Sequence, residues 1–353
     1  MQLDLVSAGL DGLLVSHLPN IHYLCGFTGS AAALLVSKRK SVFFTDGRYK
    51  QQAHDEIHGV RVVVARKPPI SMAAEWLQSN RRKLGVKVLG FDSQHLSVTE
   101  HSQLVETLRP NVRLRKAPPL IECTRMVKDA DEIGALRNAI QLGEGLFVVA
   151  TQAIRPGVAE TKVAAEMEYA ARRAGAAGMS FETIIASGPR SALPHGRATT
   201  APIPSKGFVV CDFGIILAGY CSDMTRTVHV GQPSEQARHM YAAVQEAQEA
   251  AVNAVQAGVQ VGEIDSTARR VLSRRGFGRY FTHSTGHGVG LEIHEMPRIA
   301  TRQTEPLLAG MVITIEPGVY IPEIGGVRIE DMVLVTNTGC EVLTQTSKEL
   351  LLI

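Results

Sequence analysis

Apolar and polar positions alternate with two different periods along the first third of the chain. Short runs rich in Leu, Val and Phe predict buried strands, and longer stretches with apolar residues every three or four positions predict amphipathic helices. The predicted strands are residues 12–15, 31–36, 41–45, 60–65 and 86–91, and the predicted helices are residues 46–57, 71–84 and 97–108. Because strands and helices alternate, we expect an α/β domain.

Polar residues mark the starts of several predicted helices. Asp46 and Ser71 stand where a side-chain oxygen can accept a hydrogen bond from an unpaired backbone N–H. Asp129, followed by Glu132, predicts a capping box at the start of a long helix that ends near Ile154. We expect all three helices to begin at these residues.

The segment Ala-Pro-Pro at residues 117–119 interrupts the alternation of strands and helices. A chain of 353 residues is also too long for one ordinary hydrophobic core. We therefore expect two domains, residues 1–120 and residues 121–353.

The second domain contains a weak internal repeat. One amphipathic helix is preceded by Gly157 and ends at Gly175, and a second is preceded by Gly258 and ends at Gly276. The two preceding glycines are 101 residues apart, and so are the two final glycines. Each helix follows another helix and precedes strands. Two similar helices could arise by chance, but duplication is favoured because the candidate metal ligands also divide between the halves. A duplicated α+β domain with a site at its middle is the prediction.

Two predicted hairpins each carry two carboxylates. Asp212 ends an apolar strand and Asp223 precedes a β-rich run, and Glu316 and Glu330 repeat this arrangement in the second half. Carboxylates that face one point repel each other unless a cation lies between them. Two divalent cations would balance the four negative charges, and cations about 3.5–4 Å apart can share bridging carboxylates.

His287 lies in a glycine-rich segment and adds an imidazole nitrogen to these oxygens. This donor set suits Mn²⁺, Co²⁺, Fe²⁺ or Zn²⁺ better than Ca²⁺. Asp-Phe-Gly at residues 212–214 resembles a kinase motif, but the kinase catalytic loop is missing. His294 begins a zincin-like pattern, but Arg298 stands where the second histidine of that pattern belongs.

The composition argues against a nucleic-acid-binding, a membrane-spanning or a secreted protein. Apolar residues make up 45% of the chain, the net charge is only +3, and the basic residues form no stripe, which argues against nucleic acid as a partner. No apolar run reaches the ~18 residues that a membrane span needs, and residues 1–5 lack the pattern of a signal peptide. Five cysteines without a Cys-x-x-Cys pair predict reduced thiols and a cytoplasmic protein.

Taken together, these motifs resemble those of the pita-bread metallopeptidases of family M24, in the branch of Xaa-Pro aminopeptidase and Xaa-Pro dipeptidase (prolidase). The matching segments are residues 194–196, 212–214, 219–227, 283–295, 316–318 and 326–331, together with Phe-Thr-Asp-Gly-Arg-Tyr at residues 44–49. The resemblance implies a creatinase/prolidase-like amino-terminal α/β domain over residues 1–120. It implies a pita-bread catalytic domain, a duplicated α+β fold, over residues 121–353.

The resemblance also implies roles for residues at the site. The implied metal ligands are Asp212, Asp223, His287, Glu316 and Glu330, which would hold two divalent ions, with Mn²⁺ favoured over Co²⁺, Zn²⁺ and Fe²⁺. Glu316 would carry the proton of the attacking water, His294 would stabilise the oxyanion, and His195 would lie near the scissile amide. The implied substrate-binding residues are Phe181, His283, Arg298 and Arg328, with Arg298 placed to take the carboxylate of a dipeptide.

The implied activity is metal-dependent hydrolysis of the bond between an N-terminal residue and proline. An aminopeptidase acting on peptides with proline at the second position is slightly favoured, and a dipeptidase is the alternative. The family resemblance also implies a homodimer. A peptide-binding module that kept the fold without its chemistry is the hypothesis from another class, and metal content and turnover would separate it from the enzymes.

Overall fold

The computed structural model describes residues 2–353, and side chains in the first helix from Leu5 onward. The chain divides into two compact units, residues 1–125 and residues 126–353. The expectation that residues 1–5 carry no signal peptide also concerns Met1, which lies outside the described residues. In the described part of the chain, no helix combines the length and apolar character needed to cross a membrane.

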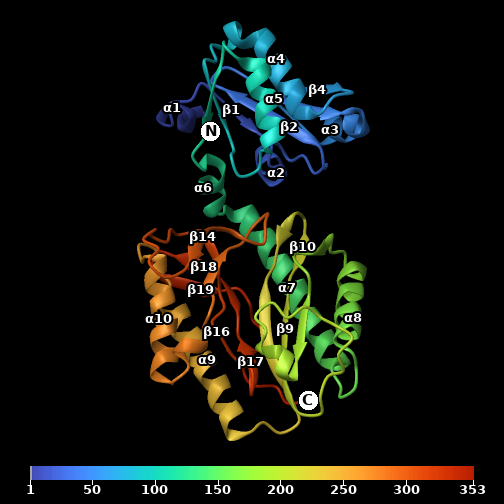
Figure 1. The fold of residues 1–353 in the computed structure, drawn as a ribbon, viewed down its shortest axis with the longest axis vertical. Helices are drawn as coiled ribbons and strands as arrows, with labels where there is room; N and C mark the ends of the chain where they lie inside the picture. Colours follow the sequence, from blue (N-terminus) through green and yellow to red (C-terminus); the bar gives the residue numbers. More distant parts are fainter. Residues whose placement is uncertain (1) are drawn as a thin grey trace. The chain divides into compact units, whose positions relative to one another are not determined.

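The first unit is built on one mixed six-stranded sheet with the order β4-β3-β2-β1-β5-β6 (Figure 1). β1 pairs antiparallel with β2 and parallel with β5, so two connections leave β1 and β5 at the same edge of the sheet. The strands are β1 (Gly12–Val15), β2 (Ala32–Ser37), β3 (Ser41–Asp46), β4 (Arg61–Ala65), β5 (Val88–Phe91) and β6 (Arg113–Lys116).

Both faces of this sheet are buried. Successive strand residues point to opposite faces, so Leu13 and Val15 pack in one apolar cluster and Leu14 packs in another. The covering helices are α1 (Gln2–Ser7), α2 (Leu18–Cys25), α3 (Lys50–Glu56), α4 (Pro69–Leu84), α5 (Val98–Leu108) and α6 (Leu120–Met126). Burial on both faces explains why the strands read as continuous apolar runs in the sequence.

Two helix starts differ from the sequence prediction. α4 begins at Pro69 and not at Ser71, because proline has no N–H to leave unpaired in the first turn of a helix. Asp46 does accept a hydrogen bond from the N–H of Arg48, but it caps a short 3-10 turn, η1 (Gly47–Tyr49), before α3 begins. Asp129 and Glu132 form the predicted capping box at the start of α7 (Ala130–Ala153).

The second unit contains two halves of similar construction. In the first half, α7 and α8 (Glu160–Arg173) pack on a three-stranded sheet, and in the second half, α9 (Glu235–Asn253) and α10 (Val261–Arg274) pack on a five-stranded sheet (Figure 1). The strands of the first half are β7 (Gly178–Met179), β8 (Ile184–Ser187), β9 (Gly207–Phe213), β10 (Ile215–Leu217), β11 (Tyr220–Cys221) and β12 (Met224–Val230). Those of the second half are β13 (Gly286–Gly288), β14 (Glu295–Ile299), β15 (Val312–Ile315), β16 (Gly318–Ile321), β17 (Gly325–Arg328), β18 (Asp331–Thr336) and β19 (Gly339–Val342).

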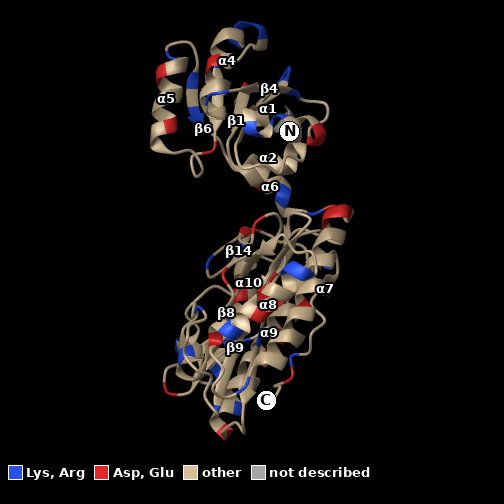
Figure 2. Ribbon diagram, turned by 90° about the vertical axis from the view of Figure 1, so that its right-hand side faces the viewer, with Lys and Arg blue, Asp and Glu red and all other residues tan. Residues whose placement is uncertain are grey.

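Backbone details repeat between the halves. The four glycines of the internal repeat all have positive φ angles, between 83° and 97°, as is typical of residues that end or precede a helix. They are Gly157, Gly175, Gly258 and Gly276. Ala159 forms an isolated bridge with Pro202, and Gln260 forms the same bridge with Pro306. The prediction of a duplicated α+β domain is therefore confirmed. Figure 2 shows Lys and Arg interspersed with Asp and Glu along the helices.

Candidate metal centre

The first hairpin places Asp212 and Asp223 on one face. β9 and β12 are antiparallel, with Asp212 opposite Thr225. Because Asp223 and Thr225 are two residues apart, their side chains share a face, and this face also carries Asp212. A side chain at Gly214 would overlap the carbonyl oxygen of Ser222, so the tight crossing beside the two aspartates requires glycine.

The second hairpin places Glu316 and Glu330 opposite each other. β15 and β18 are antiparallel, and their last pair is Ile315 with Asp331. Glu316 and Glu330 stand one step beyond this pair, on the side of the first hairpin. The N–H of Glu330 donates to the carbonyl oxygen of Thr225 at 3.1 Å, and the Thr225 hydroxyl donates to Oε2 of Glu330 at 2.7 Å. Backbone and side chain thus join the two halves at the carboxylates.

His287 lies on β13 and reaches both pairs of carboxylates. Its Nε2 is 3.6 Å from Oδ2 of Asp223 and 3.4 Å from Oε1 of Glu316. Its Nδ1 is 2.9 Å from the carbonyl oxygen of Gly288, which can only accept, so Nδ1 carries the proton. Burial lowers the pKa of His287 to about 4, so the ring is neutral. The lone pair of Nε2 therefore faces the carboxylates, as in a histidine that ligates a metal.

The buried carboxylates are incompletely paired within the described part of the chain. Oδ1 of Asp223 and Oε1 of Glu330 are buried and accept no hydrogen bond from the described residues. Burial, and then the charges of neighbouring carboxylates, raise the pKa of Asp223 and of Glu330 well above the usual range. Ligand atoms of Asp223, His287 and Glu330 lie within 4.8 Å of one another. The donor set of carboxylate oxygens and one imidazole therefore fits divalent metal ions.

A buried hydrogen-bond chain borders this centre. Arg328 donates to Asp212 through Nη2 and to the hydroxyl of Tyr320 through Nη1, at 2.6 Å in the second case. The Tyr320 hydroxyl lies 2.8 Å from Nε2 of His283, and Nδ1 of His283 lies 2.8 Å from the carbonyl oxygen of Ser284. Since Nδ1 must donate to that carbonyl, Nε2 accepts from Tyr320. Burial lowers the pKa of His283 to about 4, so His283 has no N–H left for a ligand.

All sequence-predicted site residues line one cavity of about 810 Å³. The structure brings to it Phe181, His195, Asp212, Asp223, His283, His287, His294, Arg298, Glu316, Arg328 and Glu330. The rings of His287 and His294 meet edge to face at 4.4 Å. Sequence reasoning missed Tyr320 and Thr225, because neither contact is local: Tyr320 reaches His283, and Thr225 reaches Glu330, 105 positions along the chain.

Comparison with known proteins places this geometry in a family. The description "Metallopeptidase family M24" matches residues 134–337, and "Creatinase/Prolidase N-terminal domain" matches residues 2–127. The chain belongs to metallopeptidase family M24. It is a metallopeptidase with the predicted combination of an amino-terminal creatinase/prolidase domain and a pita-bread catalytic domain, and both fold predictions are confirmed.

Members of family M24 resemble the chain over almost its full length. The Xaa-Pro dipeptidase of Pyrococcus horikoshii is 36% identical over 97% of this chain and 95% of its own. The structure of an Xaa-Pro dipeptidase from Bacillus anthracis is 41% identical, covers 100% of this chain and 98% of its own, and has a TM-score of 0.95. The structure of an X-Pro aminopeptidase from Thermotoga maritima is 34% identical, covers 99% and 100%, and has a TM-score of 0.90.

The stability of this M24 enzyme without metal is expected to fall as the pH rises. Burial, partly offset by Arg328, raises the pKa of Glu316 to about 8 in the folded chain, against an ordinary value of 4.5. The protonated carboxyl therefore contributes its full stabilisation below pH 4.5. This contribution decreases as the pH rises above 4.5 and is lost as the pH passes through 8. Bound cations reverse the effect by favouring the ionised carboxylates.

The measurement is the melting temperature of metal-free and metal-loaded protein at pH 5.5 and pH 8. The difference between the two forms at each pH cancels the titration of the rest of the chain. We expect the metal-induced rise in melting temperature to be several degrees larger at pH 8, because each unit of pKa shift corresponds to about 1.4 kcal/mol. An equal rise at both pH values would contradict the assignment of these carboxylates as the cation site.

Proposed function

We propose that the chain is an Xaa-Pro dipeptidase, which cleaves dipeptides whose second residue is proline. The observation that carries the proposal is Arg298, whose side chain lines the same cavity as the carboxylates and His287. Arg298 forms no ion pair with another described residue, so its guanidinium can pair with the free carboxylate of a dipeptide. The relatives named Xaa-Pro dipeptidase also favour this function over the aminopeptidase that the sequence slightly favoured.

The proposed cofactors are two divalent cations, with Mn²⁺ favoured. Asp212, Asp223, His287, Glu316 and Glu330 would hold them, because these five residues supply the oxygens and the unprotonated nitrogen that converge in the cavity. When bound, the cations would polarise the scissile carbonyl and lower the pKa of the attacking water.

Side chains of the protein would transfer the proton and stabilise the oxyanion. Glu316 would accept the proton of the attacking water at a carboxylate oxygen and return it to the leaving proline nitrogen. Burial lowers the pKa of His294, so its ring is neutral at pH 7 and would donate one N–H to the developing oxyanion. His195 would lie near the scissile amide.

The substrate would be bound by the walls of the cavity. Phe181 would pack against the proline ring, which has no N–H to satisfy. His283 would form a fixed neutral wall, because both of its nitrogens are engaged, and Arg328 would hold Asp212 in place. The predicted homodimer, the cytoplasmic location and a domain boundary near residue 120 stay predictions.

The test compares a dipeptide with a tripeptide. Metal-loaded enzyme is expected to hydrolyse Xaa-Pro, and to hydrolyse Xaa-Pro-Yaa far more slowly, because only the dipeptide places a carboxylate at Arg298. Efficient hydrolysis of the tripeptide would make the chain an aminopeptidase. The absence of metal-dependent turnover with either peptide would contradict both activities.

Removing the guanidinium tests the residue itself. Arg298→Ala is expected to raise the KM for Xaa-Pro by about 10- to 100-fold, which corresponds to the roughly 1.5–3 kcal/mol of a hydrogen bond to a charged group. Arg298→Lys should recover part of the loss. Arg274→Ala, at an exposed arginine of α10, is the matched control and should leave the KM unchanged. An unchanged KM in Arg298→Ala would remove Arg298 from the substrate site.

A further inference from the structure

A buried carboxylate in the first half of the second unit accepts hydrogen bonds from both ends of one loop. Glu160 is the first residue of α8 and is 0% exposed. Its Oε1 accepts from the backbone N–H and from the hydroxyl of Ser187, both at 2.8 Å. Its Oε2 accepts from the N–H of Thr199 at 3.1 Å and from the Thr199 hydroxyl at 2.9 Å. The carboxylate is therefore satisfied without solvent, as a buried charge must be.

The loop between these two ends carries His195. Ser187 is the last residue of β8, and a 3-10 turn, η2 (Gly188–Ala192), follows it. Residues 193–200 form neither helix nor strand, so no ladder of backbone hydrogen bonds holds them. His195 lies in this irregular part and lines the cavity of the metal centre. Glu160 is thus the side chain that ties the far end of the irregular segment back to a helix and a strand.

The position of the His195 ring depends on the backbone of the loop. His195 is exposed, and its ring has no hydrogen-bond partner among the described residues. Beyond the histidine, the carbonyl oxygen of Arg197 accepts a hydrogen bond from Nη2 of Arg190 at 2.7 Å. Nε of Arg190 donates to Oε2 of Glu160 at 3.0 Å, so the carboxylate also orients the guanidinium that makes this contact.

We propose that Glu160 is a positioning residue for His195, because it fixes the loop that brings this ring to the substrate. The inference rests on the proposed function, in which His195 lies near the scissile amide. Arg328 links the same loop to the metal centre, since it donates to the carbonyl oxygen of Pro194 at 3.0 Å and to Asp212. Within the described chain, Glu160 itself makes no hydrogen bond or ion pair with a candidate metal ligand.

The contacts of Glu160 require a carboxylate and not an amide. The backbone N–H groups of Ser187 and Thr199 can only donate, and each faces a different oxygen of Glu160. Glu160→Gln would place an amide NH₂ group against one of these N–H groups, whichever way the amide is turned. One end of the loop would then lose its acceptor, although the size of the side chain hardly changes. We therefore expect His195 to shift in the cavity while the core around α8 stays packed.

The experiment is a double-mutant cycle on the full-length, Mn²⁺-loaded protein, with the wild type, Glu160→Gln, His195→Ala and the double variant. Turnover of Ala-Pro and Ala-Pro-Ala is measured, and the cycle uses the peptide that the wild type hydrolyses faster. We expect Glu160→Gln to lower kcat/KM about 10- to 100-fold, as a misplacement on the order of 1 Å can do. In the His195→Ala background the same substitution should cost less than about three-fold, because no ring remains to be misplaced.

Two controls separate positioning from general damage. Glu166→Gln, at an exposed glutamate of the same helix, should leave kcat/KM unchanged. Metal content should be equal in all variants, because Glu160 contacts no candidate ligand. Equal losses from Glu160→Gln with and without His195, or a loss that follows lost metal, would overturn the proposal.

Hydrogen exchange measured by mass spectrometry gives a readout that does not need turnover. Glu160→Gln should speed amide exchange in peptides covering residues 187–199 and leave exchange at residues 281–287 as in the wild type. Unchanged exchange at residues 187–199 would overturn the proposal. If the wild type hydrolyses neither peptide, the Xaa-Pro assignment fails, whereas the exchange rates still test whether Glu160 holds the loop.

Discussion

Replacing Glu316 by Gln is expected to lower kcat by about 10³-fold or more, since positioned proton transfer alone contributes about 10²- to 10⁴-fold. The amide keeps the shape of the side chain but cannot accept a proton from water. It also removes a negative charge that lies 3.4 Å from Nε2 of His287 and helps to hold the cations. Both losses act on the reaction, whereas the cavity walls remain.

The matched control is Glu323→Gln, in the exposed turn between β16 and β17. This turn belongs to the same stretch of chain that connects Glu316 with Glu330, and Glu323 does not line the cavity. We expect its kcat to equal that of the wild type. Metal content is measured in parallel to separate loss of proton transfer from loss of cations. A kcat for Glu316→Gln within about three-fold of the wild type would exclude Glu316 from the chemistry.

Asp331→Ala is expected to lower the free energy of unfolding by about 3–5 kcal/mol, as breaking a buried ion pair typically does. Nη2 of Arg226 donates to Oδ1 of Asp331 at 2.7 Å, and the side chains are 2% and 0% exposed. Oδ2 of Asp331 also accepts hydrogen bonds from Gln248 and Lys348. Truncation would leave a buried guanidinium without its counter-charge and two further donors without their acceptor.

An exposed ion pair provides the comparison. Arg137 and Glu341 pair at 2.6 Å, but their side chains are 45% and 47% exposed. Glu341→Ala should therefore cost less than about 1 kcal/mol. Urea unfolding of both variants and the wild type measures the difference. Equal losses in the two variants would show that burial does not determine the strength of the Arg226–Asp331 pair.

The Asp331→Ala substitution should also weaken metal binding at the catalytic centre. Asp331 is adjacent to Glu330, and Arg226 donates to the backbone carbonyl of Glu330 as well as to Asp331. The pair thus fixes the backbone that carries one predicted metal ligand. We expect Asp331→Ala to bind metal more weakly even at temperatures where it remains folded.

Helices and strands with strong local signals were predictable from the chain. The capping box of Asp129 and Glu132 begins α7 as expected, because a cap is formed by residues within one helical turn. The apolar runs at residues 12–15 and 41–45 are strands β1 and β3. Short elements such as α2 and β6 were missed, since a few residues show too little periodicity to distinguish helix, strand and turn.

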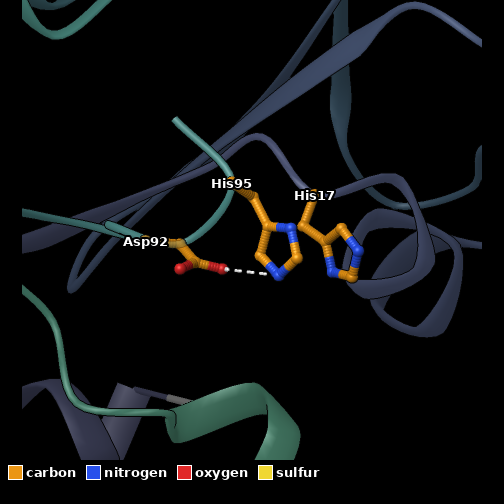
Figure 3. A group of neighbouring side chains, drawn as sticks. All are labelled: His17, Asp92 and His95. Atoms are coloured by element: carbon orange, nitrogen blue, oxygen red, sulfur yellow. Dashed lines mark ion pairs between the residues drawn. The ribbon is translucent and has the colours of Figure 1, made fainter. Parts of the chain in front are cut away.

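Within the catalytic unit, the sequence by itself identified the carboxylates and His287 as candidates, because strand ends, turns and glycine-flanked residues are local patterns. It could not show that Glu330 accepts from Thr225, that Tyr320 connects Arg328 with His283, or that Arg226 pairs with Asp331. In the first unit, the stacking of the His17 ring on the His95 ring likewise forms only once β1 and β5 pair in parallel (Figure 3). Such contacts depend on strand order, register and the packing of distant segments, whereas caps and periodicity depend on neighbours a few residues away.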